Sequence, residues 1–505
     1  MVARPAGTLA ILAGVLLGAL PLLVTRPAPL QDWPNHVARM HVLTGLLHGD
    51  GFWTRYYRFA GFLVPDAALD LGVLGLGNAG LPVGVAAQSF LVMTYLVFVA
   101  GFCALARTLG ALAPVKVAFA ILLFYCNALF WGLVNYILGV GLMLGLLALW
   151  LRCDARGGAW RRVLIAGLGA VLLLFTHLVA AAAWIVVLGA FDLHRLLADH
   201  GPVRKRLLGS TSWLVALVAV AGVLHALPGE AGHDFSIRYA GVGIGGFVVR
   251  KLALFGKLLL GGSLLQDAAS IAALLFCAGV AASARPSLAP GPSWAAAALA
   301  VVTLAAPERV GTGSVLDVRL AILPLLLLAA AVRIEPGRWA VAAVAAVVLA
   351  RTLLLAGQWH AAGGVFHDFR QQAARLPAGS VMMVAYGTPL PSLTWQQVWS
   401  PAITSIATQV VFREIFMPAL FANPAQQPIA LRPAYAVLTQ PWNMTDAAHL
   451  HATGAGLAAL CDRRRFRGVY LTVLYPGSFL PGQVGAATLH GQRDFLILDA
   501  CRLPR

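Results

Sequence analysis

The sequence predicts an α-helical polytopic membrane protein with an extracytoplasmic α/β domain at its C-terminal end. Three observations predict this fold class. Hydrophobic residues make up 60% of the 505 positions and charged residues only 11%, with a mean hydropathy of +0.82. Apolar runs recur between Ala6 and Ala356, each long enough to cross roughly 30 Å of hydrocarbon. Beyond Ala356 these runs stop and shorter, strand-like segments follow.

The apolar runs fit about eleven transmembrane helices, with extra short or re-entrant helices between them. With the N-terminus inside, Arg and Lys concentrate in the short cytoplasmic loops, as the positive-inside rule requires. An odd number of spans then places the C-terminus outside. No small-x-small cleavage site follows the first run, so we expect an uncleaved anchor. The spans are predicted near residues 8–25, 83–106, 114–130, 132–151, 162–177, 178–195, 207–227, 268–284, 294–306, 317–333 and 338–356.

This scheme divides the chain into a transmembrane domain, 1–358, and a C-terminal extracytoplasmic domain, 359–505. The transmembrane domain carries a long first outer loop, 26–82, and a second outer loop, 228–267. In the first loop, the apolar spacing after Pro34 predicts an amphipathic helix on the membrane surface. The loop also contains a short, glycine-rich segment near 67–81 that we expect to be partial or re-entrant.

In the C-terminal domain, runs rich in β-branched and aromatic residues predict four strands, with helical or loop segments between them, including 446–465. No G-x-G-x-x-G or Walker lysine accompanies these strands, so we expect no nucleotide or redox cofactor. The basic residues form no stripe, which argues against a nucleic-acid partner despite the net charge of +17. The strands are predicted at 380–386, 435–439, 467–475 and 494–500.

The six cysteines form no C-x-x-C pair. Cys461 and Cys501 both belong to the outer domain, where oxidising conditions permit a disulfide between them. Two buried thiols are the alternative.

Asp32 is the first candidate for chemistry. It lies in the first outer loop, in the polar and aromatic sequence QDWPNH. A carboxylate in this place is suited to acid–base chemistry at the membrane surface. The alternative is that Asp32 caps the helix that begins at Pro34, a common role for aspartate.

This order of features resembles the GT-C class of membrane glycosyltransferases, which transfer a sugar from a polyprenyl-phosphate carrier. The resemblance rests on Asp32 in a long first outer loop, with weaker support from WGLVNY at 131–136 and LDVRL at 316–320. Many members have a second acidic residue beside the first, whereas here Trp33 follows Asp32. The two-carboxylate metal motif is therefore missing, although Asp66, Asp70 or the pair His233–Asp234 could supply a second group, and a divalent cation stays open.

The resemblance implies an inverting displacement in which Asp32 is the base and an arginine binds the phosphate of the donor. For Arg319 the alternative is an ion pair with Asp317 or Glu308. The candidate phosphate ligands are Arg319, Arg309, Arg238 and Arg58. The supporting polar residues are Asn35, His36, His233, Asp234 and Asp317.

Two other features of the outer face have mainly structural interpretations. Arg250, Lys251 and Lys257 form a basic segment that we interpret as snorkelling to the headgroups, with anion binding as the alternative. His177, at an outer turn, is expected to be a packed residue.

The implied partners are the bilayer, a polyprenyl-phosphate-sugar donor and a glycan, lipid or protein acceptor. Heavy use of Ala, Arg and Gly is typical of a GC-rich bacterial genome, so we expect a bacterial plasma-membrane protein with its C-terminal domain periplasmic or extracellular. The alternative functions are a lipid or solute transporter or flippase, which needs ionisable residues within the membrane, and a non-catalytic assembly protein.

Overall fold

The structure is a computed structural model that divides into two compact units. The first unit comprises Met1–Leu23, Leu63–Leu69 and Ser89–Gly357, and the second comprises Val24–Phe62, Asp70–Gln88 and Gln358–Arg505. The structure describes residues 5–198, 200, 210–226, 236–239, 243–284, 286–310, 314–389, 392–401, 405–424, 426–462, 466–492 and 494–504.

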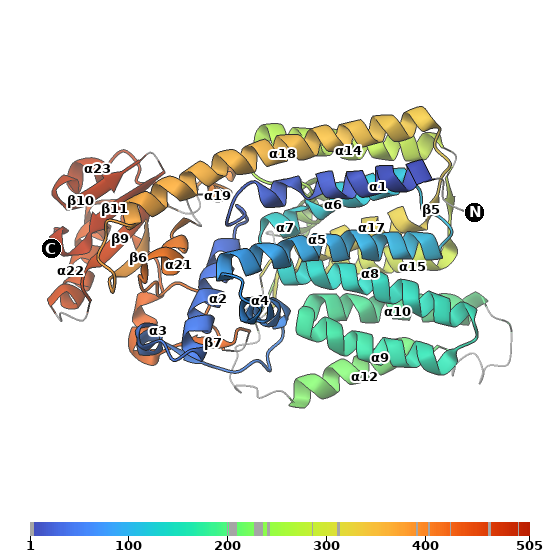
Figure 1. Ribbon diagram of the computed structural model, residues 1–505, viewed down its shortest axis with the longest axis horizontal. Coiled ribbons are helices and arrows are strands. Elements are labelled where there is room, and N and C mark those ends of the chain that lie inside the picture. Colours follow the sequence, from blue (N-terminus) through green and yellow to red (C-terminus); the bar gives the residue numbers. More distant parts are fainter. Residues whose placement is uncertain are drawn as a thin grey trace. The chain divides into compact units, whose positions relative to one another are not determined.

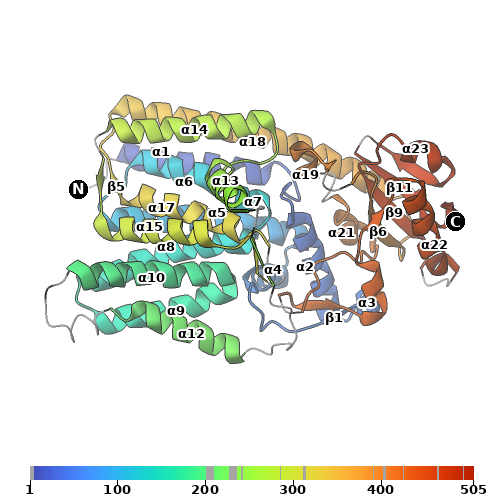
Figure 2. The same cartoon turned by 180° about the vertical axis from the view of Figure 1, so that it is seen from behind.

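The first unit is built from long apolar helices that lie side by side (Figures 1 and 2). Six helices among the described residues are long and apolar enough to cross a membrane. Helix α18 is the longest and continues beyond the first unit, well past the end of the span predicted at 338–356. The six are α5 (Val83–Thr108), α8 (Val134–Ala155), α9 (Ala159–Thr176), α10 (Leu178–Ala198), α14 (Leu264–Ser283) and α18 (Arg338–Ala373).

The faces of these helices show why an apolar solvent suits them. On α9, Leu164, Leu168 and Leu172 are exposed at four-residue intervals, which places them on one stripe of the helix. The opposite stripe, which includes Ala170 and Leu173, is buried in the unit. An exposed stripe made of leucine fits lipid and not water.

Other predicted spans are shorter or interrupted in the structure. The run predicted at 114–130 is broken into α6 (Pro114–Phe124) and α7 (Asn127–Phe130), and the run at 317–333 into α16 (Leu316–Leu320) and α17 (Ile322–Ala331). Other helices among the described residues of the unit are α1 (Pro5–Gly18), α12 (Ser212–Ala226), α13 (Gly243–Gly256) and α15 (Pro290–Ala305). The total of about eleven spans stays a prediction.

The break between α6 and α7 is held by polar side chains. The Arg351 guanidinium on α18 donates to the backbone carbonyl of Tyr125 at 3.0 Å and to the Ser270 hydroxyl at 3.0 Å. The Asn127 side-chain amide donates to the carbonyl of Leu260 at 2.8 Å. An interrupted helix frees backbone groups that have no water to bind in a membrane, so such partners stabilise the break.

The second unit contains a five-stranded mixed sheet in the order β10-β11-β9-β6-β8. The central strand β9 (Val469–Leu474) is parallel to β6 (Val381–Tyr386) and antiparallel to β11 (Phe495–Asp499). The edges are β8 (Trp442–Asn443), parallel to β6, and β10 (Thr488–Gly491), antiparallel to β11. Helix α22 (Ala447–Asp462) connects β8 to β9.

Three of the four predicted strands correspond to β6, β9 and β11, whereas the strand predicted at 435–439 is wrong. Residues Pro433–Leu438 form the 3-10 helix η3, with proline in its first turn. Proline has no N–H to donate to a sheet, which favours a turn here. Tyr435 packs edge-on against Phe416, at 5.3 Å between ring centroids, so its aromatic ring fills the core without a strand.

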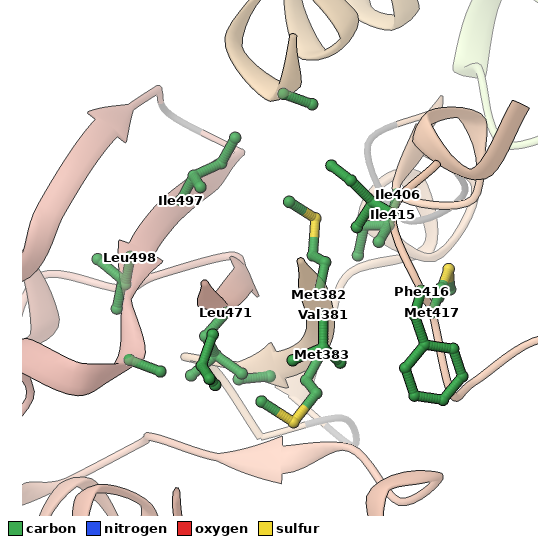
Figure 3. Close-up of a cluster of buried hydrophobic side chains, with 14 of the residues drawn as sticks. Val381, Met382, Met383, Ile406, Ile415, Phe416, Met417, Leu471, Ile497 and Leu498 are labelled. Atoms are coloured by element: carbon green, nitrogen blue, oxygen red, sulfur yellow. The ribbon is translucent and has the colours of Figure 1, made fainter. Parts of the chain in front are cut away.

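The first outer loop contributes to the same core as the C-terminal sheet. Ala38, Val42 and Leu43 of α2 (Trp33–Leu47) belong to one buried cluster with the sheet residues. Figure 3 shows part of this cluster, where side chains of β6, β9 and β11 meet Ile406, Ile415, Phe416 and Met417. The prediction of a surface helix in this loop is therefore wrong for α2, whose apolar side packs against protein.

Two further contacts attach the loop within this unit. Strand β1 (Tyr57–Phe59) pairs antiparallel with β7 (Ile429–Leu431). The Tyr56 ring, at the end of α3 (Gly51–Tyr56), stacks on Phe416 with ring centroids 4.1 Å apart. The segment near 67–81 forms α4 (Ala68–Asn78).

Near the C-terminus, Cys461 of α22 forms a disulfide with Cys501 of η5 (Ala500–Arg502). Of the two alternatives open from the sequence, the structure has the disulfide.

Candidate functional site

Asp32 stands at the N-cap position of α2, but its side chain makes no capping hydrogen bond. Its backbone dihedrals, φ −94° and ψ −11°, are helical, whereas a capping aspartate has extended backbone. The helix-capping interpretation is therefore wrong. Asp32 is partly buried, so the carboxylate is neither fully solvated nor sealed in the core. Its role as a base stays a prediction.

Asn35 and His36 hold α2 in place within the second unit. The Asn35 amide donates to the carbonyl of Ala419 at 3.2 Å and its oxygen accepts from the N–H of Phe421 at 2.8 Å. The His36 ring lies edge-on to the Phe421 ring, with centroids 5.1 Å apart. Burial lowers the pKa of His36 well below its usual range and the nearby Arg39 lowers it further, so His36 is neutral at pH 7. Both residues support Asp32 by fixing the start of its helix.

Asp70 is committed to an ion pair. Both of its carboxylate oxygens accept from Arg39 of α2, at 2.8 and 2.9 Å, and the side chains are only 1% and 3% exposed. A carboxylate with a bidentate arginine partner is satisfied. Asp70 is therefore not the second acidic group that the GT-C resemblance left open, and its pair with Arg39 joins α2 to α4 instead.

A polar cluster in the first unit brings together Asp66, Asn135, Tyr136, His177 and Arg319. The Asn135 amide donates to the carbonyl of Asp66 at 2.5 Å, and the Tyr136 hydroxyl donates to the carbonyl of Arg319. The Arg319 guanidinium lies 3.3 Å from Nε2 of His177, which is 4.0 Å from the Asp66 carboxylate. We call these five residues the Arg319 cluster.

Both ring nitrogens of His177 lie beside hydrogen-bond donors. The backbone N–H of Val179 lies 3.1 Å from Nδ1, and the Arg319 guanidinium lies 3.3 Å from Nε2. His177 is buried and its ring lies edge-on to the Tyr136 ring, with centroids 5.3 Å apart, so it is a packed residue as expected. Its contact with Arg319 helps to hold the guanidinium, whose fork of N–H groups suits the oxygens of a carboxylate or a phosphate.

The backbone of the Arg319 cluster is also unusual. Asp66 has a φ of +69°, in the left-handed region that a non-glycine residue seldom adopts. The amide of Asn135 fixes this conformation through the carbonyl of Asp66. Strained conformations cost free energy and persist where surrounding contacts impose them, often at functional sites.

Asp317 is paired with Lys251 and not with Arg319. Lys251 Nζ donates to the Asp317 carboxylate at 2.6 Å and to the carbonyl of Ala306 at 2.7 Å, with the two charged side chains 2% and 3% exposed. Glu308 accepts from Arg250 at 2.6 Å. The expected alternative for Arg319, an ion pair with Asp317 or Glu308, is therefore wrong, and so is snorkelling for Lys251.

The other predicted phosphate ligands are exposed. Arg238 and Arg309 face each other across the ribbon of β2 (Ile237–Arg238) and β4 (Arg309–Val310), and both are exposed. Arg58 is exposed on β1. His233 and Asp234 lie outside the described residues. In the part of the chain that the structure describes, no group of three His, Cys, Asp or Glu side chains is arranged to hold a metal ion.

The long apolar helices and the buried polar clusters define a multi-pass membrane protein. Its fold is similar to that of a known structure, the crystal structure of ArnT from Cupriavidus metallidurans bound to undecaprenyl phosphate. The similarity covers 99% of this chain and 98% of ArnT, with a TM-score of 0.55 and 11% sequence identity. The GT-C fold expected from the sequence is thereby confirmed. No protein-family model matches the chain, and no curated protein matches its sequence.

Proposed function

We propose that the protein is a membrane glycosyltransferase that takes a sugar from a polyprenyl-phosphate carrier and transfers it to a hydroxyl group of an acceptor. The observation that carries the proposal is the similarity of almost the whole chain to ArnT, in a structure described as bound to undecaprenyl phosphate. The donor lipid comes from that protein and is part of the proposal here. The proposed location is the outer face of a bacterial plasma membrane, with the N-terminus cytoplasmic.

The proposed chemistry is a single inverting displacement. Asp32 accepts the proton of the acceptor hydroxyl while the hydroxyl oxygen bonds to the anomeric carbon of the sugar. The bond from that carbon to the carrier phosphate breaks, and its electron pair stays on the phosphate oxygen. Asp32 supports this role because its partly buried carboxylate stands at the start of a rigidly held helix.

The negative charge that develops on the departing phosphate needs hydrogen-bond donors. The guanidinium of Arg319 supplies several, and His177, whose Nε2 lies 3.3 Å from it, helps to hold it in position. Arg319 is the first candidate because a fork of N–H groups fits phosphate oxygens. Arg309, Arg238 and Arg58 are the other candidate ligands of the donor phosphate. Asp32 and Arg319 belong to different units, so the two roles rest on separate observations and have separate tests.

The test of the base is a pair of substitutions. We expect Asp32→Asn and Asp32→Ala each to lower transfer from a labelled polyprenyl-phosphate sugar by about 100-fold or more, because general-base catalysis contributes roughly that factor. The measurement is product formation by purified protein in lipid nanodiscs. Asp446→Asn, an exposed aspartate of the second unit, is the matched control and should keep full activity. Unchanged transfer in both Asp32 variants would remove Asp32 as the base.

The test of the phosphate ligand is Arg319→Lys beside Arg319→Gln. Lysine keeps the charge but loses the fork, so we expect it to retain part of the kcat that glutamine loses. A matched control is Arg375→Gln, an exposed arginine of the second unit. Equal activity of both Arg319 variants and the control would exclude phosphate binding by Arg319.

A lipid or solute transporter is the second candidate function, and one observation favours it. The interrupted helix α6–α7, held by the buried Arg351, is the kind of discontinuity that transporters use for substrate sites. The Arg351 guanidinium donates to the carbonyl of Tyr125 and to the hydroxyl of Ser270. These two hydrogen bonds explain its burial without a bound substrate. Wild-type protein that moves labelled lipid between leaflets, but transfers no sugar from any donor, would favour the transporter.

The proposed reaction uses no nucleotide or redox cofactor, and a divalent cation is left open. The measurement is transfer activity after treatment with EDTA, with and without added Mg²⁺ or Mn²⁺. Loss of activity restored by a cation would assign a metal to the reaction.

A further inference from the structure

The second unit contains a cavity of about 660 Å³ that has no role in the steps described above. One wall is a single face of α2, because its lining positions recur every three or four residues. The opposite face of α2 packs into the core of the unit. The α2 residues that line the cavity are Trp33, Pro34, Val37, His41, Thr44 and Gly45, and His48 directly follows the helix.

The remaining walls are largely apolar. Pro82, Val83 and Val85 line the cavity from the start of α5, and Val411 and Phe412 line it from α21 (Thr408–Arg413). All lining residues belong to the second unit. A mostly apolar cavity with a few polar groups is the usual form of a small-molecule site, and this volume lies in the usual range.

The lining of the cavity carries more positive than negative charge. Arg26 and Arg370 line it, and among the described residues neither guanidinium forms an ion pair. Arg370 is held in position by stacking over the Phe412 ring, 4.5 Å from its centroid. The acidic lining residue, Asp50, is occupied because it accepts a hydrogen bond from the N–H of Phe52 as the N-cap of α3. The cavity therefore complements an anion attached to an apolar body.

The volume sets how much of an occupant the cavity encloses. At ~30 Å³ for each non-hydrogen atom, which is the volume of one water, the cavity holds roughly twenty such atoms. The cavity is open on one side, so most of a polyprenyl tail would lie outside it. One acyl-type chain of modest length with an anionic head is enclosed as a whole.

The position of Asp32 points to the role of this occupant. Asp32 directly precedes Trp33 and Pro34, which form the first turn of the helix that lines the cavity. A base must lie near the hydroxyl that it deprotonates. A molecule in this cavity would have its hydroxyl near Asp32, which suits the acceptor and not the donor.

We propose that this cavity binds the acceptor, and that the acceptor is a single-chain anionic amphiphile with a free hydroxyl. The role of this amphiphile as acceptor rests on the proposed glycosyltransferase function. Its binding in the cavity does not depend on that function. Arg370 binds the anionic group, the faces of α2 and α21 enclose the chain, and the hydroxyl lies toward the start of α2.

The test uses lauroyl lysophosphatidate with a photoreactive diazirine in its chain, because this probe carries a phosphate, a hydroxyl and one short chain. Full-length protein in nanodiscs is irradiated with the probe, and labelled peptides are identified by mass spectrometry. We expect labels in 33–53, 82–88 or 408–413. The uncharged control, a monolauroyl glycerol with the same diazirine, should label these peptides about tenfold less, since a charged hydrogen bond is lost.

Two matched pairs of variants test the cavity. An added Cβ at Gly84, which lines the cavity, meets no atom within 4 Å, so Gly84→Phe fills the space while Gly84→Ala leaves most of it open. We expect labelling to be lost in Gly84→Phe and kept in Gly84→Ala. Arg370→Gln should weaken lysophosphatidate labelling by about tenfold, whereas Arg375→Gln, which does not line the cavity, should not change it. Equal thermal stability of the two Gly84 variants shows that filling has not unfolded the unit.

Labelling that persists in Gly84→Phe, or that lies outside the three segments, would overturn the inference. Loss of polyprenyl-phosphate binding in Gly84→Phe would also overturn it, because the cavity would then hold the donor. Photolabelling needs no turnover, so sugar release from the donor is measured separately. Labelling without any sugar release would contradict the glycosyltransferase and the acceptor role together. Sugar release without labelling would contradict the cavity alone.

Discussion

At the scale of single residues, Arg39 and Asp70 form a buried ion pair inside the second unit. Their side chains are almost completely buried and joined by three hydrogen bonds, one from Nε and two from Nη2 of Arg39. Removing one partner leaves the other charge buried and unpaired. We expect Asp70→Asn or Arg39→Gln to lower the free energy of unfolding by about 3–5 kcal/mol, measured by thermal or chemical denaturation.

The control for this pair is the double variant Arg39→Met with Asp70→Leu. It removes both charges and keeps apolar volume, so we expect it to be more stable than either single variant. Single variants as stable as the wild type would mean that the pair contributes nothing to the fold.

Two histidines of α2 predict how the stability of the second unit depends on pH. Burial lowers the pKa of His36 and of His41 below 6.5, with Arg39 adding to the effect at His36 and Asp50 opposing it at His41. Each histidine then takes up a proton more readily when unfolded, so stability is present above pH 6.5 and is lost as the pH falls. We expect a lower Tm at about pH 5.5 than at about pH 7.5.

The variant His36→Gln removes one of these titrating groups and should flatten the decrease in Tm. His451→Gln, at an exposed histidine of α22, is the control and should keep the decrease in Tm. A Tm that rises on acidification in the wild type would contradict the burial of both rings.

At the scale of elements, α5 and α8 are in backbone contact through glycines. A Cβ at Gly101 would overlap the carbonyl oxygen of Gly141, and a Cβ at Gly141 would lie 2.6 Å from Cα of Phe98. Small residues allow this close approach of membrane helices. We expect Gly141→Ala to lower stability by about 1–3 kcal/mol, because the helices must separate. Thermal denaturation in detergent gives the measurement.

The matched control is Gly222→Ala in α12, where an added Cβ meets no atom within 4 Å. There we expect no loss of stability, and a small gain from better helix propensity. Equal effects at Gly141 and Gly222 would show that the α5–α8 contact is not tight.

At the scale of the whole molecule, the predicted topology places the C-terminus outside. A periplasmic reporter such as alkaline phosphatase fused after Arg505 should be active, because it would fold in an oxidising compartment. The same reporter fused after Gly157, in the turn between α8 and α9, should be inactive. Activity at Gly157 and none at Arg505 would reverse the orientation. The disulfide between Cys461 and Cys501 agrees with an oxidising side for the second unit.

Much of the fold could be predicted because hydrophobic length and period are local properties of the chain. The runs that became α5, α8, α9 and α10 are continuous and apolar, so their positions follow from composition alone. The strands β6, β9 and β11 were predicted from β-branched and aromatic residues. The break after α6 was not predicted, because it depends on distant partners such as Arg351 and Leu260.

The sequence by itself determined the membrane class, the apolar spans, Asp32 as the residue to examine and the GT-C resemblance. Each follows from residue type and spacing along the chain. Only the tertiary structure decided which charges are paired with one another: Asp70 with Arg39, Asp317 with Lys251, and Arg319 beside His177. It also decided that α2 belongs to the core of the C-terminal sheet. The physical reason is that ion pairs and core contacts join residues far apart in the chain, and spacing along the chain carries no information about them.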